Sequence, residues 1–214
     1  MNDGPPDDAS VVSMLTTEHF TLQTARSATI SEATGRSGTY LSSVSGGLVA
    51  LSLLANVSKL GPAFVLAGFA VGVTLLLLGL TTFQRLLEVG IEDVRYGQGI
   101  ARIRRSYLER APHLRSVLIQ SEHDDLRSVM SNMGIESGPA QLLVTGASGV
   151  AVVNSALTAA LAGGAVAGLN WPMGWIFALT LLVGVASMWA HLRYQRRFWA
   201  RFEVWSVPQF PASV

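Results

Sequence analysis

Four long runs of uncharged, mostly apolar residues alternate with polar segments along the chain. They cover residues 40–57, 62–83, part of 142–169, and 171–189, and none contains Asp, Glu, Lys, Arg or His. A helix of about 20 residues crosses the hydrocarbon core of a bilayer, which is ~30 Å thick. The pattern therefore predicts an all-α integral membrane protein with four transmembrane helices, arranged as two hairpins.

The composition favours the same class. Only 14% of the 214 residues are charged and 50% are hydrophobic, whereas roughly 25% charged residues is usual in soluble domains. The net charge of +1 excludes the strongly basic surface that nucleic-acid binding requires. Cysteine is absent, so disulfides, thiolate metal sites and a cysteine nucleophile are excluded as well.

The basic residues predict the orientation of the four spans. Two arginines precede the first run, eight lie between the second and third, and four follow the last, whereas the short loop at residues 56–61 has only Lys59. Lys and Arg near membrane ends are retained on the cytoplasmic side. We therefore expect a multi-pass membrane protein with both termini in the cytoplasm.

The polar segments predict the domain organisation. We expect a cytoplasmic N-terminal segment at 1–39, helical from about residue 11, a transmembrane hairpin at 40–83 and a cytoplasmic helical hairpin at 84–141. A second transmembrane hairpin at 142–191 and a cytoplasmic segment at 192–214 follow. Between Val89 and Tyr107, apolar residues at helical spacing form a stripe that needs a partner helix. Either 114–133 or 11–39 could supply that helix.

The third span contains the most regular pattern in the sequence, which is two rows of small residues at every fourth position. The first row is Ala147, Ala151, Ser155, Ala159, Gly163 and Ala167; the second is Ser148, Ala156, Ala160, Gly164 and Gly168, interrupted by Val152. Small residues let helices approach closely in lipid. The rows therefore predict helix packing, within the subunit or between subunits, or the wall of an aqueous pore.

Few polar side chains lie inside the predicted spans. Proton-driven carriers keep a carboxylate or histidine at membrane depth because such groups are costly there, and these spans contain none. Asn154 is the one side chain that could line a permeation path or form a hydrogen bond across a subunit interface, but an interhelical hydrogen bond within the subunit is the better interpretation.

The segment Ser121-Glu-His-Asp-Asp125 contains possible metal ligands, because histidine and carboxylates bind divalent ions. A metal-dependent hydrolase needs more ligands in defined geometry, so a solvated turn or helix start is the better interpretation. No nucleophile, base and orienting group can be assembled elsewhere. We therefore expect neither an enzyme nor a bound metal or cofactor.

Four arginines follow the last span, interleaved with aromatic residues: Arg193, Arg196, Arg197 and Arg201. They can determine topology and lie on solvated helix faces, contact anionic lipid, or bind an anionic cytoplasmic ligand.

Three stretches, beginning at Thr21, Ile91 and Ile100, make the chain similar to uncharacterised four-span membrane proteins of actinobacteria. They read TLQTARSATISEA, IEDVRY and IARIRRSYLE. The resemblance implies a four-span protein of the bacterial plasma membrane, but that family has no assigned function and therefore provides no site residues. In architecture the chain also resembles the SLATT effectors, which are proposed to form membrane pores.

Two functions are consistent with these features. The first is an oligomeric channel or pore whose subunits associate through the small residues and whose cytoplasmic helices control gating. The second is a non-conducting scaffold that recruits a cytoplasmic partner protein, or anionic lipid, to the Val89–Tyr107 face or to the arginines.

Overall fold

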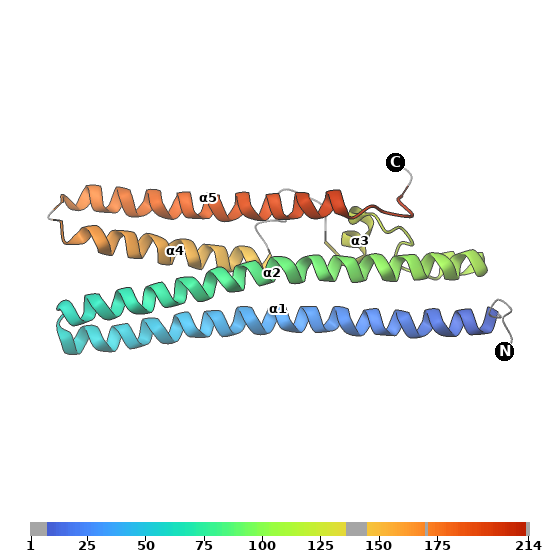
Figure 1. Cartoon of the computed structure of the whole chain (residues 1–214), viewed down its shortest axis with the longest axis horizontal. Coiled ribbons are helices and arrows are strands. Elements are labelled where there is room, and N and C mark those ends of the chain that lie inside the picture. Colours follow the sequence, from blue (N-terminus) through green and yellow to red (C-terminus); the bar gives the residue numbers. More distant parts are fainter. Residues whose placement is uncertain (1–7, 136–144, 170, 213–214) are drawn as a thin grey trace. The chain divides into compact units, whose positions relative to one another are not determined.

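A computed structural model describes residues 8–135, 145–169 and 171–212, and the elements in these ranges are all helical (Figure 1). Five α-helices and one short 3-10 helix follow in the order α1 (Asp8–Ser58), α2 (Pro62–Arg110), η1 (Pro112–Ser116), α3 (Leu126–Asn132), α4 (Gly146–Ala167) and α5 (Met173–Trp205). The predicted all-α class is confirmed for the described residues.

Four of the helices are long and apolar enough to cross a membrane, as predicted: α1, α2, α4 and α5. α1 and α2 are unbroken over 51 and 49 residues (Figure 1), so each continues well beyond the roughly 20 residues that a bilayer requires. After Arg110 the chain forms η1 and the short α3, whereas the sequence suggested a longer helix within 114–133. Pro112 prevents α2 from continuing directly into such a helix.

In each hairpin a proline lies where the second helix begins. Pro62 is the first residue of α2, where the missing N–H costs nothing. Pro172 lies just before α5 and accepts a hydrogen bond from the Trp175 N–H at 2.9 Å. In the first turn, Lys59 and Leu60 both have positive φ angles, 48° and 60°. This left-handed conformation is unusual without glycine and reverses the chain within three residues.

The helices contribute to two compact units. The first unit comprises Ala33–Glu88 and Leu142–Trp199. We call it the membrane unit because the four apolar runs that are predicted to span a membrane lie in these ranges. Its core contains Tyr40, Phe83, Leu86, Leu87, Ala147, Val150 and Ala151, drawn from α1, α2 and α4. Aromatic and large aliphatic side chains thus fill the space between the helices.

The polar unit comprises Met1–Glu32, Val89–Gln141 and Ala200–Val214. In it the first part of α1 packs against the last part of α2: Leu22 lies against Gly99, and the Arg26 Nε lies 2.8 Å from Asp93 Oδ1. α3 packs on the same part of α2, because Val129 lies against Gly97. Both segments that the sequence offered as partners for the Val89–Tyr107 stripe therefore contact α2 between these two residues.

Candidate functional site

The two rows of small residues on α4 have different surroundings. Most of the first row is buried within the membrane unit: Ala147, Ala151, Ser155 and Gly163 are buried, Ala159 is half-buried and Ala167 is exposed. Most of the second row is exposed: Ala156, Ala160, Gly164 and Gly168, with Ser148 buried at its start. The predicted helix packing therefore occurs inside the subunit along the first row.

α5 is the helix against which the later part of the first row packs, around Ala159 and Gly163. A Cβ added at Gly163 would collide with the Thr180 hydroxyl, and one added at Gly184 would lie 3.3 Å from the Cβ of Ala159. These glycines allow the two backbones to approach to a distance that no larger residue permits. The small residues at this interface consequently act as packing surfaces within the subunit.

Asn154 lies in a polar contact between three helices. Its Oδ1 accepts a hydrogen bond of 2.7 Å from the Tyr40 hydroxyl on α1, and both residues are 0% exposed. The asparagine side chain lies directly over Gly79 of α2, where an added Cβ would meet the Tyr40 hydroxyl at 2.6 Å. The interhelical hydrogen bond within the subunit, one of the three interpretations of Asn154, is thus present, while its Nδ2 has no partner in the described structure.

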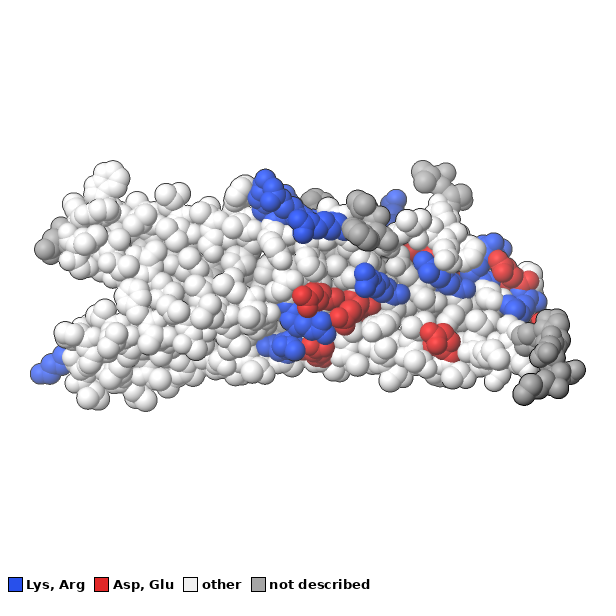
Figure 2. Space-filling view, viewed as in Figure 1, with Lys and Arg blue, Asp and Glu red and all other residues white. Residues whose placement is uncertain are grey.

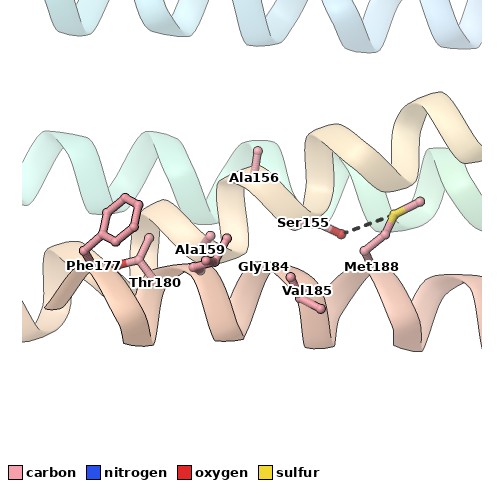
Figure 3. Close-up of a pocket in the computed structure, with 9 residues that line it drawn as sticks. Ser155, Ala156, Ala159, Phe177, Thr180, Gly184, Val185 and Met188 are labelled. Carbon is pink, nitrogen blue, oxygen red and sulfur yellow. Dashed lines mark hydrogen bonds between the residues drawn. The ribbon is translucent and has the colours of Figure 1, made fainter. Parts of the chain in front are cut away.

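A shallow groove of ≈ 350 Å³ runs between α4 and α5, with the labelled side chains of Figure 3 along it. Ala156 and Ala159 lie on its α4 side, and Phe177 and Val185 on its α5 side. Ser155 Oγ donates a hydrogen bond of 2.7 Å to the Ala151 carbonyl and contacts the Met188 sulfur at 4.0 Å. Because its hydroxyls are occupied by helix carbonyls, the groove presents an apolar surface.

Three of the four predicted arginines lie together on α5, shortly before the last residue of the membrane unit, Trp199. Arg193, Arg196 and Arg197 line a hollow of ≈ 270 Å³ with Trp189 and Leu192. The Arg193 guanidinium lies 5.2 Å from the centre of the Trp189 ring, which is within cation–π range. Arg201 belongs to the polar unit and does not line this hollow.

The possible metal ligands within 121–125 interact with other groups of the protein. Glu122 pairs with the Arg115 side chain at 2.7 Å, whereas Asp124 and Asp125 accept hydrogen bonds from backbone N–H groups. Asp124 is 0% exposed, and its carboxylate accepts hydrogen bonds from the Gln209 N–H at 2.9 Å and the Phe210 N–H at 2.7 Å. Arg102 Nε donates to the same carboxylate at 2.7 Å. Among the described residues no group of three ligands is placed to hold a metal ion.

Asp125, the neighbour of Asp124 in the sequence, has two roles. As the N-cap of α3, it accepts a hydrogen bond from the Ser128 N–H at 2.9 Å, so the helix start that the sequence suggested is present. Its second oxygen accepts a hydrogen bond from the Ala212 N–H at 3.0 Å. Together the two aspartates hold residues 206–212, which we call the tail segment. The expectation of a solvated turn is wrong for Asp124, which the tail segment covers.

The tail segment also sets the ionisation of these carboxylates. Burial by itself would raise the pKa of Asp124, but hydrogen bonds from Gln209, Arg102 and Phe210 outweigh it and hold that pKa below its ordinary value. The pKa of Asp125 is lowered too, because N–H groups of Ala212 and Ser128 outweigh burial. Both carboxylates are therefore charged at neutral pH.

The apolar stripe of α2 is largely covered inside the polar unit, where Val89, Ile100 and Ile103 are buried. Apolar side chains remain uncovered in the segment after η1 instead: Val117 is 70% and Ile119 fully exposed. Sequence periodicity alone could not show this, because residues 114–119 have the same apolar character as a buried helix face.

Comparison of the chain with known proteins gives no relative from which a role could be assigned. No protein-family model, no curated protein and no solved structure matches it. The site must therefore be interpreted from its own geometry.

Proposed function

We propose that the protein assembles from several copies into a passive channel or pore in the bacterial plasma membrane, with both termini in the cytoplasm and gating through the polar unit. The observation that supports this most is the exposed second row on α4: Ala156, Ala160, Gly164 and Gly168. A helix that leaves a row of small residues uncovered offers a surface on which another transmembrane helix can pack closely.

The interior of one subunit leaves little room for a permeation path. Tyr40, Phe83 and Leu87 are buried in the core between α1, α2 and α4. In our proposal the aqueous path therefore lies between copies of the chain, and the small residues keep neighbouring subunits close around it. The uncharged spans fit passive permeation better than proton-driven transport, which uses an ionisable group at membrane depth.

The test combines subunit counting with flux. The full chain is placed in lipid nanodiscs for native mass spectrometry and in liposomes for ion flux under applied voltage and at several pH values. We expect a closed ring of subunits and measurable flux. Ala160→Leu should break the ring, whereas Ala165→Leu is the matched control, because Ala165 is exposed on the same helix about 140° away. A monomer without flux in wild-type protein would refute the proposal.

A second candidate function is a non-conducting scaffold that recruits a cytoplasmic partner protein. The exposed apolar side chains of Val117 and Ile119 favour it, because contiguous exposed apolar groups mark interaction sites. The Val89–Tyr107 face is less suitable than the sequence suggested, since the chain's own helices cover it. A monomeric protein that co-purifies with one partner in fixed stoichiometry, lost in Ile119→Ser, would favour the scaffold over the channel.

A further inference from the structure

The arginine hollow on α5 carries positive charge that no described carboxylate neutralises. Arg193, Arg196 and Arg197 are exposed and form no ion pair with any described residue. On the face shown in Figure 2, blue side chains gather on α5 with no red atoms among them. Three guanidinium groups within five residues thus create a concentrated positive potential on one helix.

The composition of the membrane unit explains why these charges are unpaired. Its sequence ranges contain six basic residues but only one acidic residue, Glu88. That carboxylate accepts hydrogen bonds from Gln84 Nε2 at 3.0 Å and from Arg85 Nη1 at 3.4 Å. The unit therefore has no second carboxylate to offer the arginines, and an external anion is the complementary partner.

The position of the hollow on the helix indicates where that anion comes from. At about 100° per residue, Leu182, Trp189, Arg193 and Arg196 lie within about 60° of one another on α5. Leu182 and Trp189 are 65% and 62% exposed, as expected for side chains that face lipid. The same face of α5 thus changes from apolar, through an aromatic residue typical of the membrane interface, to basic.

The hollow itself has the chemistry of a headgroup site. Its walls combine the apolar Leu192 and the Trp189 ring with three guanidinium groups, and each guanidinium can donate two parallel hydrogen bonds to phosphate oxygens. The cation–π contact with Trp189 restricts the Arg193 side chain before a ligand binds, so less conformational entropy is lost on binding.

We propose that this hollow binds the phosphate headgroup of an anionic phospholipid, whose acyl chains lie along the apolar face of α5. Arg193, Arg196 and Arg197 contact the phosphate, and Trp189 positions Arg193 and lies at the depth of the headgroup. The site is independent of the proposed channel, because it needs neither a second subunit nor a permeation path.

The test measures lipid binding to the full chain in detergent micelles by native mass spectrometry. The probes are dioctanoyl-phosphatidylglycerol, dioctanoyl-phosphatidylcholine and inorganic phosphate. We expect the anionic lipid to bind more tightly than the zwitterionic one, and inorganic phosphate not to compete at equal concentration. Arg193→Gln, Arg196→Gln and Arg197→Gln should each weaken binding of the anionic lipid about fivefold, which corresponds to about 1 kcal/mol per arginine near a membrane surface.

Two further variants separate a built site from general attraction of positive charge. Arg201→Gln removes the same charge from the same helix outside the hollow and should change binding less than twofold. Trp189→Ala leaves the charge unchanged yet should weaken binding about threefold, because Arg193 loses its stacking partner. All these side chains are exposed, so the variants should fold, which thermal unfolding in detergent verifies.

Three results would overturn the inference. Equal affinity for the two lipids would show that headgroup charge is not recognised. An equal loss of lipid binding in Arg201→Gln and Arg196→Gln would show that the lipid is attracted by positive charge in general and not bound in the hollow. Competition by inorganic phosphate at equal concentration would make the ligand a free anion, not a lipid.

Discussion

Different interactions hold the helices together in the membrane unit and in the polar unit. The polar unit's ranges contain nine basic and thirteen acidic residues, whereas those of the membrane unit contain six and one. In the polar unit, ion pairs such as Arg26–Asp93 at 2.8 Å connect α1 and α2. In the membrane unit, glycine and alanine contacts such as Gly184–Ala159 connect α4 and α5.

The two kinds of interaction follow from the surroundings that each composition suits, which are lipid for the apolar membrane unit and water for the charged polar unit. Around apolar spans the lipid is as apolar as the side chains, so close packing and a few interhelical hydrogen bonds must hold the helices together. In water, burial of apolar surface drives association, and charged groups can define register at modest cost. Variants that add volume should therefore harm the membrane unit most, and variants that remove charge should act mainly on the polar unit.

The largest effect is expected at Gly79. Gly79→Ala places a methyl group against Asn154 and the Tyr40 hydroxyl, so the helices must separate or lose the Tyr40–Asn154 hydrogen bond. Overpacking of this kind costs about 1–3 kcal/mol, and the lost hydrogen bond adds to it. We expect the free energy of unfolding, measured by denaturant titration in mild detergent, to fall by about 3 kcal/mol.

Gly68→Ala is the matched control, because nothing lies within 4 Å of a Cβ added there. Alanine is a better helix former than glycine by about 1 kcal/mol, so this variant should be neutral or more stable. Equal destabilisation of both variants would contradict the close approach at Gly79.

The next effect is expected in the polar unit, at Asp124. Asp124→Asn removes the negative charge that holds the Gln209 and Phe210 amides and the Arg102 side chain. Hydrogen bonds to a charged group contribute about 1.5–3 kcal/mol. Hydrogen exchange of the tail segment should therefore accelerate by more than tenfold.

Glu109→Gln is the control for this variant, since its carboxylate pairs with Arg105 at 2.9 Å on an exposed helix face. Exposed ion pairs contribute little, so exchange in the tail segment should not change. If Asp124→Asn also leaves that exchange unchanged, then the carboxylate does not hold the tail segment.

Acidification should release the same segment without any substitution. The folded pKa of Asp124 lies below its ordinary value of 3.8. Stabilisation from a lowered carboxylate pKa is complete above the ordinary pKa and is lost as the pH falls through the folded one. The tail segment should remain attached at pH 5 and detach below pH 3.8, as followed by hydrogen exchange or limited proteolysis. Release that begins near pH 6 would point to a different group.

The smallest effect is expected at Tyr40. Tyr40→Phe keeps the ring in the core but removes the hydroxyl that donates to Asn154 Oδ1 at 2.7 Å. Interhelical hydrogen bonds within membranes average about 0.6 kcal/mol, with a maximum near 1.7. We therefore expect a loss of about 1 kcal/mol in the same detergent titration, which is smaller than the loss in Gly79→Ala.

Local chemistry was sufficient to predict the four long apolar helices. Runs of uncharged residues long enough to cross a bilayer locate the four apolar helices, because length and hydropathy alone decide whether a segment can cross. Pro62 marks the start of α2 for an equally local reason. The α3 N-cap at Asp125 was less specific, since the same five residues also contained possible metal ligands.

Contacts between distant segments decided the rest. Both small-residue rows of α4 are equally suited to packing, and only the positions of the neighbouring helices determine that most of the first is buried and most of the second exposed. Likewise, no neighbour in sequence distinguishes Asp124 from a solvated aspartate, since its partners are backbone N–H groups 85 and 86 residues away. A helix can be inferred from its own residues because its hydrogen bonds are local, whereas burial depends on which surfaces the folded chain brings together.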